Sequence, residues 1–311
     1  MTALRILLLG KNGQVGAALR PRLACLGDLS AHDRTTCDLG DVARLRDVIR
    51  TARPDLIVNA AAYTAVDKAE AEHDLCHRIN AVAPGVLAEE AKAAGAWLVH
   101  YSTDYVFDGN KASPYTEDDA TAPLNAYGRA KCAGEQAIAV ATPDHTILRV
   151  SWVYGIAGRN FATTILRLAS ERDELRVVAD QWGTPTSADL IADVTAELAQ
   201  RFILSDARRG HAARGCFHLA PSGYTSWHRY AIELVREARR QNWPLKLSED
   251  TIVPITTKQY PTVAARPRNS VLDTTKLRHL LSFDTFPWQA PLTDFISQLN
   301  RLQQKDIEIL K

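Results

Sequence analysis

The sequence lacks the features that mark secreted, membrane-spanning and nucleic-acid-binding proteins. Its five cysteines are odd in number, scattered and never in a C-x-x-C arrangement, which argues against a disulfide scaffold and indicates a reducing compartment. No apolar run approaches the ~20 residues that span a bilayer, and the first, residues 6–9, ends at Gly10, too early for a signal peptide. Lys and Arg total 37 against 36 Asp and Glu, and the resulting charge of +1 provides no field to hold nucleic acid or an anionic membrane. We therefore expect a cytoplasmic protein with neither as a partner.

What the sequence does contain is typical of a folded chain large enough to hold an enzyme site. Of its 311 residues, 46% are hydrophobic and 23% are charged, which excludes a disordered chain. At ~150 residues per domain, this length predicts about two domains.

Short apolar runs and helical patterns alternate over the first half of the chain. We predict strands over 5–9, 29–32, 56–58, 97–101 and 146–150, and helices over 15–26, 41–49, 73–94 and 126–140. Repeated strand–helix–strand units with apolar strands are typical of a parallel sheet covered by helices on both faces. The predicted fold class is therefore α/β, with a Rossmann-type doubly wound parallel sheet.

The alternation loosens in the second half. We predict helices over 161–171, 188–202, 226–240, 274–281 and 291–302, and a strand over 215–219. We therefore divide the chain into a first domain, 1–150, with parts of 151–220 returning to its sheet, and a smaller C-terminal α/β domain mainly within 151–311.

A glycine loop joins the first predicted strand to the first helix. Gly10, Gly13 and Gly16 are spaced G-x-x-G-x-x-G, which lets the chain turn tightly, a pyrophosphate approach the backbone and the helix pack on the strand. Free N–H groups at the helix start would meet the phosphate charge. An ordinary strand-to-helix turn is the alternative, but the position in the first strand–helix–strand unit favours dinucleotide binding and makes 1–150 an NAD(P)-binding domain.

Residues after the second predicted strand bear on the choice of cofactor. Asp33 could accept from an adenosine ribose and favour NAD, whereas Arg34 could pair with a 2′-phosphate and favour NADP. The sequence leaves that choice open. Asp38 and Leu39 are placed to contact the adenine, with a role in a turn and helix cap as the alternative.

The third predicted strand ends in a run of small residues. Ala61 and Ala62 lie just beyond it and would let a cofactor approach the backbone closely. A tight turn between strand and helix is the alternative interpretation.

Tyr127 and Lys131 form a Y-x-x-x-K pair on a predicted helix. A spacing of four residues places both side chains on one face, where an ammonium group favours the phenolate of the tyrosine. Such a tyrosine can exchange a proton with a carbonyl or alcohol oxygen. Thr103 lies just beyond the fourth predicted strand, where ligands bind in open α/β sheets, and its hydroxyl can orient a substrate oxygen toward the tyrosine. Together with the glycine loop, these residues predict a dehydrogenase or reductase site.

Longer stretches of the chain resemble a known family. The matching stretches are GKNGQVG from Gly10, RPDLIVNAAAYTAVDKAE from Arg53, GAWLVHYSTDYVFDG from Gly95, PLNAYGRAKCAGE from Pro123, RVSWVYG from Arg149, NFATTILRLA from Asn160, DQWGTPT from Asp180 and ARPRNSVLDTTKL from Ala265. They extend over nearly the whole chain and are similar to the dTDP-4-dehydrorhamnose reductases, which are extended short-chain dehydrogenases/reductases.

The resemblance implies an NADPH- or NADH-dependent reduction of the 4-keto group of dTDP-4-dehydro-L-rhamnose, with Tyr127 as the proton donor and Thr103 tuning its environment. It also implies that Asp104 and Trp152 contact the substrate together with Thr103. Arg266 and Asn269 are candidates for contacts to the nucleotide, with a structural loop role as the alternative. The implied cofactor contacts are Gly13, Gln14, Val15, Asp38, Leu39, Ala62, Tyr63, Thr64, Tyr127 and Lys131.

The family's magnesium ion is the point at which this chain departs from the pattern. The resemblance implies a dimer contact held by acidic side chains, one of them early in the first helix, where this chain has Ala18. Asp189 could serve elsewhere. We therefore assign no metal-binding residues and expect a monomer or weak homodimer.

Two other functions are open alternatives. The first is another sugar-nucleotide short-chain enzyme, an epimerase or dehydratase, although Tyr105 stands directly after Asp104 where a dehydratase would need an additional carboxylate. The second is a non-catalytic NADP-binding regulatory subunit, which Tyr127 and Lys131 alone do not exclude. The sequence also leaves open whether the base is thymidine or uridine.

Overall fold

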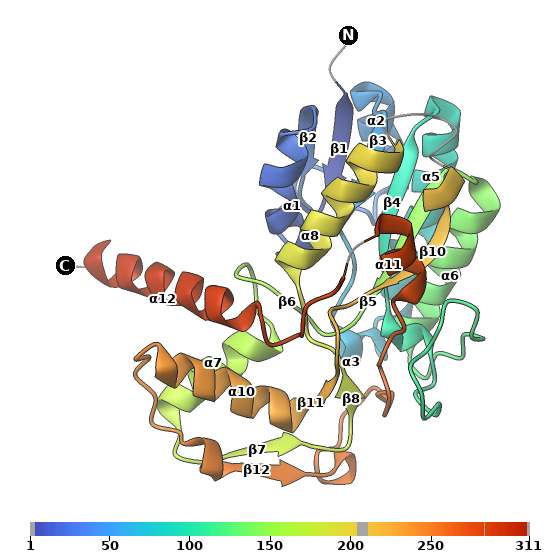
Figure 1. Cartoon of the computed structure of the whole chain (residues 1–311). Coiled ribbons are helices and arrows are strands. Elements are labelled where there is room, and N and C mark those ends of the chain that lie inside the picture. The colour runs from blue at the N-terminus through green and yellow to red at the C-terminus, as the bar shows by residue number, and fades with distance from the viewer. Residues whose placement is uncertain (1–3, 204–210, 283, 310–311) are drawn as a thin grey trace.

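The larger of two lobes is built on a six-stranded parallel sheet (Figure 1). The computed structural model describes residues 4–203, 211–282 and 284–309. The strand order is β10-β5-β4-β3-β1-β2, so the chain reverses direction across the sheet between β1 and β3. The strands are β1 (Arg5–Leu9), β2 (Asp28–His32), β3 (Leu56–Asn59), β4 (Trp97–Thr103), β5 (His145–Val150) and β10 (Gly215–Leu219).

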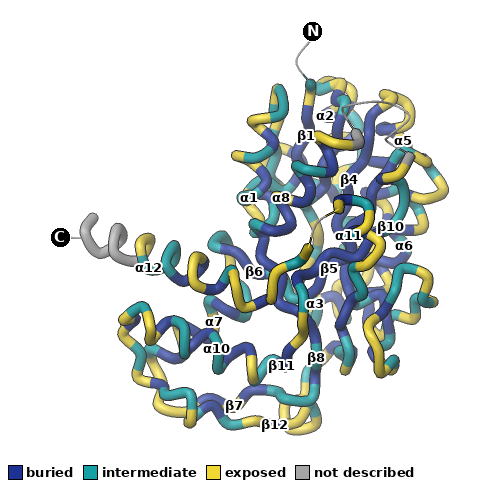
Figure 2. Tube along the Cα trace, in the orientation of Figure 1, coloured by how far each residue is buried: buried dark blue, intermediate teal, exposed yellow. Residues whose placement is uncertain are grey.

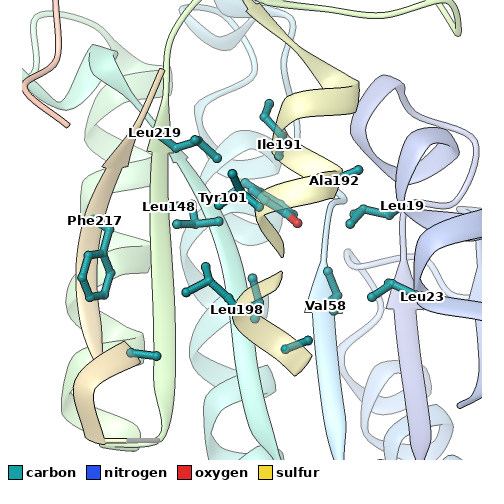
Figure 3. Packing of buried hydrophobic residues seen from close by; sticks show 14 of the residues in the cluster. Leu19, Leu23, Val58, Tyr101, Leu148, Ile191, Ala192, Leu198, Phe217 and Leu219 are labelled. Carbon is teal, nitrogen blue, oxygen red and sulfur yellow. The ribbon is translucent and has the colours of Figure 1, made fainter. Parts of the chain in front are cut away.

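Helices cover both faces of this sheet because alternate apolar side chains of each strand point to opposite sides. One face packs on α1 (Gln14–Ala24), α8 (Ala188–Leu198) and α11 (Thr275–Leu281). Figure 3 shows this packing, in which Leu19 and Leu23 of α1 and Ile191 of α8 approach Val58 and Tyr101 of the sheet.

The opposite face of the sheet has its own apolar core. It packs on α2 (Val42–Ala52), α5 (Ala83–Ala94) and α6 (Ala126–Ala141). Buried residues follow the strands and the inner sides of these helices, whereas exposed residues lie on the outer turns and loops (Figure 2).

The smaller lobe has a separate apolar core formed by three helices and a short parallel sheet. Its helices are α7 (Phe161–Glu171), α10 (Trp227–Arg240) and α12 (Leu292–Ile309), and its sheet pairs β7 (Leu175–Val178) with β12 (Ile252–Ile255). Two-residue strands lie between the lobes: β6 (Val153–Tyr154) pairs with β9 (Thr186–Ser187), and β8 (Trp182–Gly183) pairs with β11 (Thr225–Ser226). Over the described ranges, no helix is both long and apolar enough to cross a membrane.

Short helices complete the fold. They are α3 (Val66–Ala69), α4 (His73–His77), the π-helices η1 (Arg78–Val82) and η3 (Ala199–Ile203), and the 3₁₀-helices η2 (Asp104–Val106), η4 (His211–Ala213), η5 (Glu249–Thr251) and η6 (Thr257–Gln259).

The structure confirms the α/β fold class and corrects several element boundaries. The helix predicted over 73–94 is divided into α4, η1 and α5, because one turn has the wider π geometry. The helix predicted over 188–202 likewise changes to π geometry after Leu198, and the last helix extends to Ile309 rather than 302.

Candidate active site

A cleft of about 760 Å³ opens at the carboxyl ends of the strands, where the chain reverses between β1 and β3. This is the position at which open α/β sheets bind ligands. Most residues predicted to hold the cofactor line it: Gly10, Gly13, Gln14, Val15, Asp38, Leu39, Ala61, Ala62, Tyr63, Thr64, Tyr127 and Lys131. Gly16, Thr103, Asp104 and Trp152 are not among its lining residues.

The glycine loop is packed so tightly that side chains would not fit in it. Gly10 has a φ of 83°, and a Cβ atom there would lie 2.7 Å from the backbone nitrogen of Ala61. A Cβ atom on Gly16 would collide with the carbonyl oxygen of Gly10, so Gly16 holds the helix against the loop rather than facing the cleft. Gly13 begins α1 without a side-chain cap and no acidic residue lies in the first turn, which suits a phosphate group.

Asp33 makes several hydrogen bonds within the protein, whereas Arg34 is largely exposed. The Asp33 carboxylate accepts from the Thr35 hydroxyl at 2.6 Å and from the Asn12 amide at 2.9 Å, and Lys11 lies 3.3 Å away. The Thr35 hydrogen bond is the main cause that lowers the pKa of Asp33. The Arg34 side chain is 77% exposed and reaches Asp38 at 3.3 Å.

The loop after β3 is fixed by a side chain from the π turn. The Asn80 amide oxygen accepts from the Tyr63 backbone N–H at 2.9 Å, and the Asn80 amide nitrogen donates to the Tyr63 carbonyl oxygen at 2.9 Å. Ala61 and Ala62 precede this clamped residue and line the cleft. The sequence did not single out Asn80, because a continuous helix was predicted there.

Helix α6 brings Tyr127 and Thr103 together. Asn125 caps the helix by accepting from the Gly128 N–H at 2.8 Å, so that Tyr127 lies in its first turn. Desolvation raises the pKa of Tyr127, and the nearby Thr103 hydroxyl opposes that effect.

Lys131 is 2% exposed and lines the cleft from the same helix face. Its ammonium group donates to the Tyr101 carbonyl oxygen at 2.5 Å, and its Nζ lies 3.1 Å from Nε2 of His100. Burial lowers the pKa of Lys131 to about 8. A lysine with this pKa can take part in proton transfer near neutral pH.

Asp104 is buried next to the catalytic candidates. Thr103 donates to its Oδ1 at 3.1 Å, whereas its Oδ2 has no hydrogen-bond partner within the described structure. Burial raises the pKa of Asp104 to about 6. The buried Ser270 side chain also faces this carboxyl group, which does not line the cleft.

Trp152 occupies an unusual backbone conformation, with a φ of 47°. Its indole stacks on Trp227 with ring centroids 3.5 Å apart. The ring also packs against Gly183, where a Cβ atom would collide with it. One face of this indole is therefore taken up by packing between the lobes.

Arg266, Asn269 and Asp189 are engaged in contacts within the protein. The Arg266 guanidinium donates to Asp67 at 2.8 Å and thereby ties a C-terminal loop to α3. The Asn269 amide donates to the Lys111 carbonyl oxygen at 2.7 Å. The Asp189 carboxylate lies 3.0 Å from the Arg22 guanidinium, so it is paired with a cation of the protein itself. In the part of the chain that is described, no three His, Cys, Asp or Glu side chains form a metal-binding group.

Other residues of the cleft were missed by the sequence reasoning. Ser102 lines it from β4, and Gly158 and Arg159 line it from the loop before α7. Asn160, the N-cap of α7, donates to the Gln14 side chain at 2.9 Å and joins this loop to the glycine loop. A basic residue directly before a helix cap was the available signal for Arg159.

Comparisons with known proteins agree with this geometry. Residues 4–301 match the family model described as the RmlD substrate binding domain. The chain is 46% identical to dTDP-4-dehydrorhamnose reductase of Escherichia coli K12, over 95% of this chain and 98% of that protein. It is 44% identical to the enzyme of the same name from Burkholderia thailandensis, over 92% of this chain and 96% of that protein.

A solved structure is similar over the same length. The dTDP-4-dehydrorhamnose reductase of Bacillus anthracis in complex with NADP has a TM-score of 0.84 and 33% identity, covering 96% of this chain and 100% of that one. This chain belongs to the RmlD family, whose curated members at this level of identity are dTDP-4-dehydrorhamnose reductases.

Proposed function

We propose that this chain reduces the 4-keto group of dTDP-4-dehydro-L-rhamnose to give dTDP-L-rhamnose, with NADPH or NADH as the reductant. The observation that carries the proposal is the placement of Tyr127 and the buried amine of Lys131 on one side of α6, where both line the cleft that the glycine loop also lines. The names of the relatives at 44–46% identity support this substrate.

The residues of the cleft fit a dinucleotide. The uncapped start of α1 would hold the pyrophosphate, and the small residues Ala61 and Ala62 leave room beside the backbone. The relative solved with NADP supports the same cofactor class. When bound, the cofactor supplies the hydride that is added to the fourth carbon of the sugar.

Tyr127 supplies the proton in this proposal. Its O–H bond breaks as the proton passes to the sugar oxygen, and Thr103 keeps the tyrosine hydroxyl and that oxygen in line. Lys131 lies one helical turn away and stabilises the negative charge that Tyr127 acquires. Asp104 is proposed to accept from a sugar hydroxyl, and Trp152 to bound the sugar pocket.

We also propose that the enzyme acts in the cytoplasm as a monomer or weak homodimer. All five cysteines are free thiols, which suits a reducing compartment. Ala18 stands early in the first helix, where the resemblance implies an acidic side chain, and Asp189 lies 3.0 Å from the Arg22 guanidinium, so neither favours a metal-bridged dimer.

The decisive experiment measures NADPH oxidation by the purified chain with dTDP-4-dehydro-L-rhamnose and identifies the product by mass and NMR. Tyr127→Phe removes only the acidic hydroxyl, so we expect kcat to fall by about 10²- to 10⁴-fold. Tyr260→Phe, at a tyrosine that is 58% exposed, is the matched control and should leave kcat unchanged.

Two results would contradict the proposal. An unchanged kcat in Tyr127→Phe would remove Tyr127 from its role as proton donor. Tightly retained NAD with no net oxidation of reduced cofactor would point instead to an epimerase or dehydratase.

A further inference from the structure

Three buried polar side chains form a row behind the cleft, and the mechanism above uses only the first of them. Lys131, His100 and Asn59 are 2%, 1% and 1% exposed. Nζ of Lys131 lies 3.1 Å from Nε2 of His100, and Nδ1 of His100 lies 3.1 Å from the amide nitrogen of Asn59. The row runs from α6 through β4 to β3, so residues far apart in the sequence meet there.

The orientation of the Asn59 amide decides how His100 can bind. The backbone N–H of Ala61 donates to Oδ1 of Asn59 at 3.2 Å, so the amide NH₂ is the group that faces Nδ1 of His100. An amide NH₂ can only donate. Nδ1 must therefore accept, and a neutral His100 carries its hydrogen on Nε2, facing Lys131.

His100 is held in the neutral form by its surroundings. Burial is the main cause that lowers its pKa well below the ordinary value, and a proton on Lys131 or His145 acts in the same direction whenever it is present. The neutral ring has one N–H group, and the Asn59 contact assigns that group to Nε2. An N–H that faces Nζ of Lys131 can bond only to the lone pair of a neutral amine.

The other groups that face Lys131 do not require its ammonium form. The Tyr101 carbonyl oxygen, 2.5 Å from Nζ, accepts an N–H from either the amine or the ammonium. The Glu135 carboxylate favours the ammonium form, but it is paired with the Arg149 guanidinium at 2.7 Å. The Cys76 thiol also faces Lys131, and burial raises the pKa of that thiol, which keeps it uncharged.

We propose that Asn59 and His100 are positioning residues that favour the neutral amine of Lys131 and so ease the return of a proton to Tyr127. This role rests on the proposed function. After Tyr127 has given its proton to the sugar oxygen, an N–H bond of the Lys131 ammonium breaks and the O–H bond of Tyr127 forms again. The Nε2–H group of His100 then donates to the lone pair left on Nζ, and the amine regains a proton from the solvent, which supplies the H⁺ that the overall reduction consumes.

The test reads the two groups directly by NMR on the full-length chain without substrate. Long-range ¹H–¹⁵N correlations of His100 should show hydrogen on Nε2 and a lone pair on Nδ1. The ¹³Cε resonance of Lys131 can be assigned by its loss in Lys131→Met. Its titration should give a pKa lower than that of an ordinary lysine.

Asn59→Asp reverses the tautomer with almost no change in shape. A carboxylate beside Nδ1 accepts rather than donates, so Nε2 becomes a lone pair that accepts from the ammonium of Lys131. We expect the pKa of Lys131 to rise by about one pH unit or more, and the alkaline limb of the NADPH-oxidation rate to move with it. Asn110→Asp, at an exposed loop residue, should change neither.

Two outcomes would overturn the inference: hydrogen on Nδ1 of His100 in the unmodified protein, or a Lys131 titration that is the same in folded Asn59→Asp. The first measurement needs no variant, so it decides the question even if Asn59→Asp does not fold. A protein that shows the expected tautomer but reduces no keto sugar would contradict the proposed function and leave this inference standing.

Discussion

Asp33 and Arg34 follow β2 directly. The two side chains differ in how many of their hydrogen-bonding groups are free to bind a ligand. The Asp33 carboxylate already accepts from Thr35 and Asn12, so a ribose hydroxyl would have to displace contacts that shape the turn. The Arg34 guanidinium is exposed, and its ion pair in the described part of the chain is with Asp38, at 3.3 Å. An exposed pair of this kind contributes little to stability and yields readily to a phosphate.

We therefore expect NADPH to be preferred over NADH. Arg34→Ala should raise KM for NADPH by about tenfold, since a charge-assisted hydrogen bond to phosphate is worth about 1.5–3 kcal/mol. KM for NADH should be unchanged, because that cofactor lacks the 2′-phosphate. Steady-state kinetics with both cofactors make the measurement, and Arg20→Ala, at an exposed residue of α1, is the control. Equal changes for the two cofactors would contradict a phosphate contact.

At the scale of single residues, the sequence predicted the parts of the site that local spacing determines. Gly10 and Gly13 follow a strand directly, and Tyr127 and Lys131 share a helix face, so their neighbours in sequence are also their neighbours in space. His100 and Asn59 were not predicted, because they are 41 residues apart and meet only through the pairing of β3 with β4.

At the scale of elements, the π turn η1 is a feature that the spacing of apolar residues does not predict. The apolar pattern over 73–94 continues through the turn, so the sequence predicts one helix. The structure inserts the wider turn at Arg78–Val82, from which Asn80 reaches the backbone of Tyr63. The short strands β7 and β12 were missed for a different reason, because Arg176 interrupts the apolar run of the first and Pro254 that of the second.

Gly134 is the residue of α6 that lets this turn approach. A Cβ atom at that position would collide with the carbonyl oxygen of Asn80. Gly134→Ala should therefore lower the free energy of unfolding by about 1–3 kcal/mol and weaken NADPH binding through the displaced Tyr63 loop. Denaturant unfolding and cofactor titration would measure the two effects.

Gly85→Ala is the matched control for this prediction. Its Cβ atom would lie 3.2 Å from the side chain of Ala137, a tight contact that a small shift relieves, and alanine favours the helix by about 1 kcal/mol over glycine. Its stability should be close to that of the unmodified chain. If both variants behaved alike, close approach at Gly134 would not be the cause.

At the scale of the whole molecule, Asp104 links stability to pH. Its pKa in the folded chain is raised to about 6 from 3.8, so folding favours its protonated form. The stability that this proton contributes is complete below the unfolded pKa and is lost as the pH rises through the folded pKa. A pKa rise of about two units means that, at a pH above the folded pKa, the chain has lost roughly 3 kcal/mol of its free energy of unfolding.

Asp104→Asn should therefore gain stability relative to the unmodified chain as the pH rises. We expect the difference in the free energy of unfolding to grow by up to about 3 kcal/mol between about pH 4 and about pH 8. Urea unfolding without ligand would measure it, and Asp118→Asn, at an exposed carboxyl, should show no such trend. If the difference in the free energy of unfolding did not change with pH, folding would not raise the pKa of Asp104, and the prediction would be wrong.

The return of β10 to the edge of the large sheet has a consequence for how the chain folds during synthesis. β5 is paired on one side with β4 and on the other with β10, whose last residue is Leu219. Helix α8, which covers part of one face of the sheet, comes after α7 and β7 of the small lobe in the chain. A ribosome that has completed residue 150 has produced a sheet in which β5 is still an edge strand and one apolar face is covered by α1 but not yet by α8 and α11. We expect the nascent chain to be most prone to aggregation over that interval, and to lose this tendency as α8, β10 and finally α11 emerge.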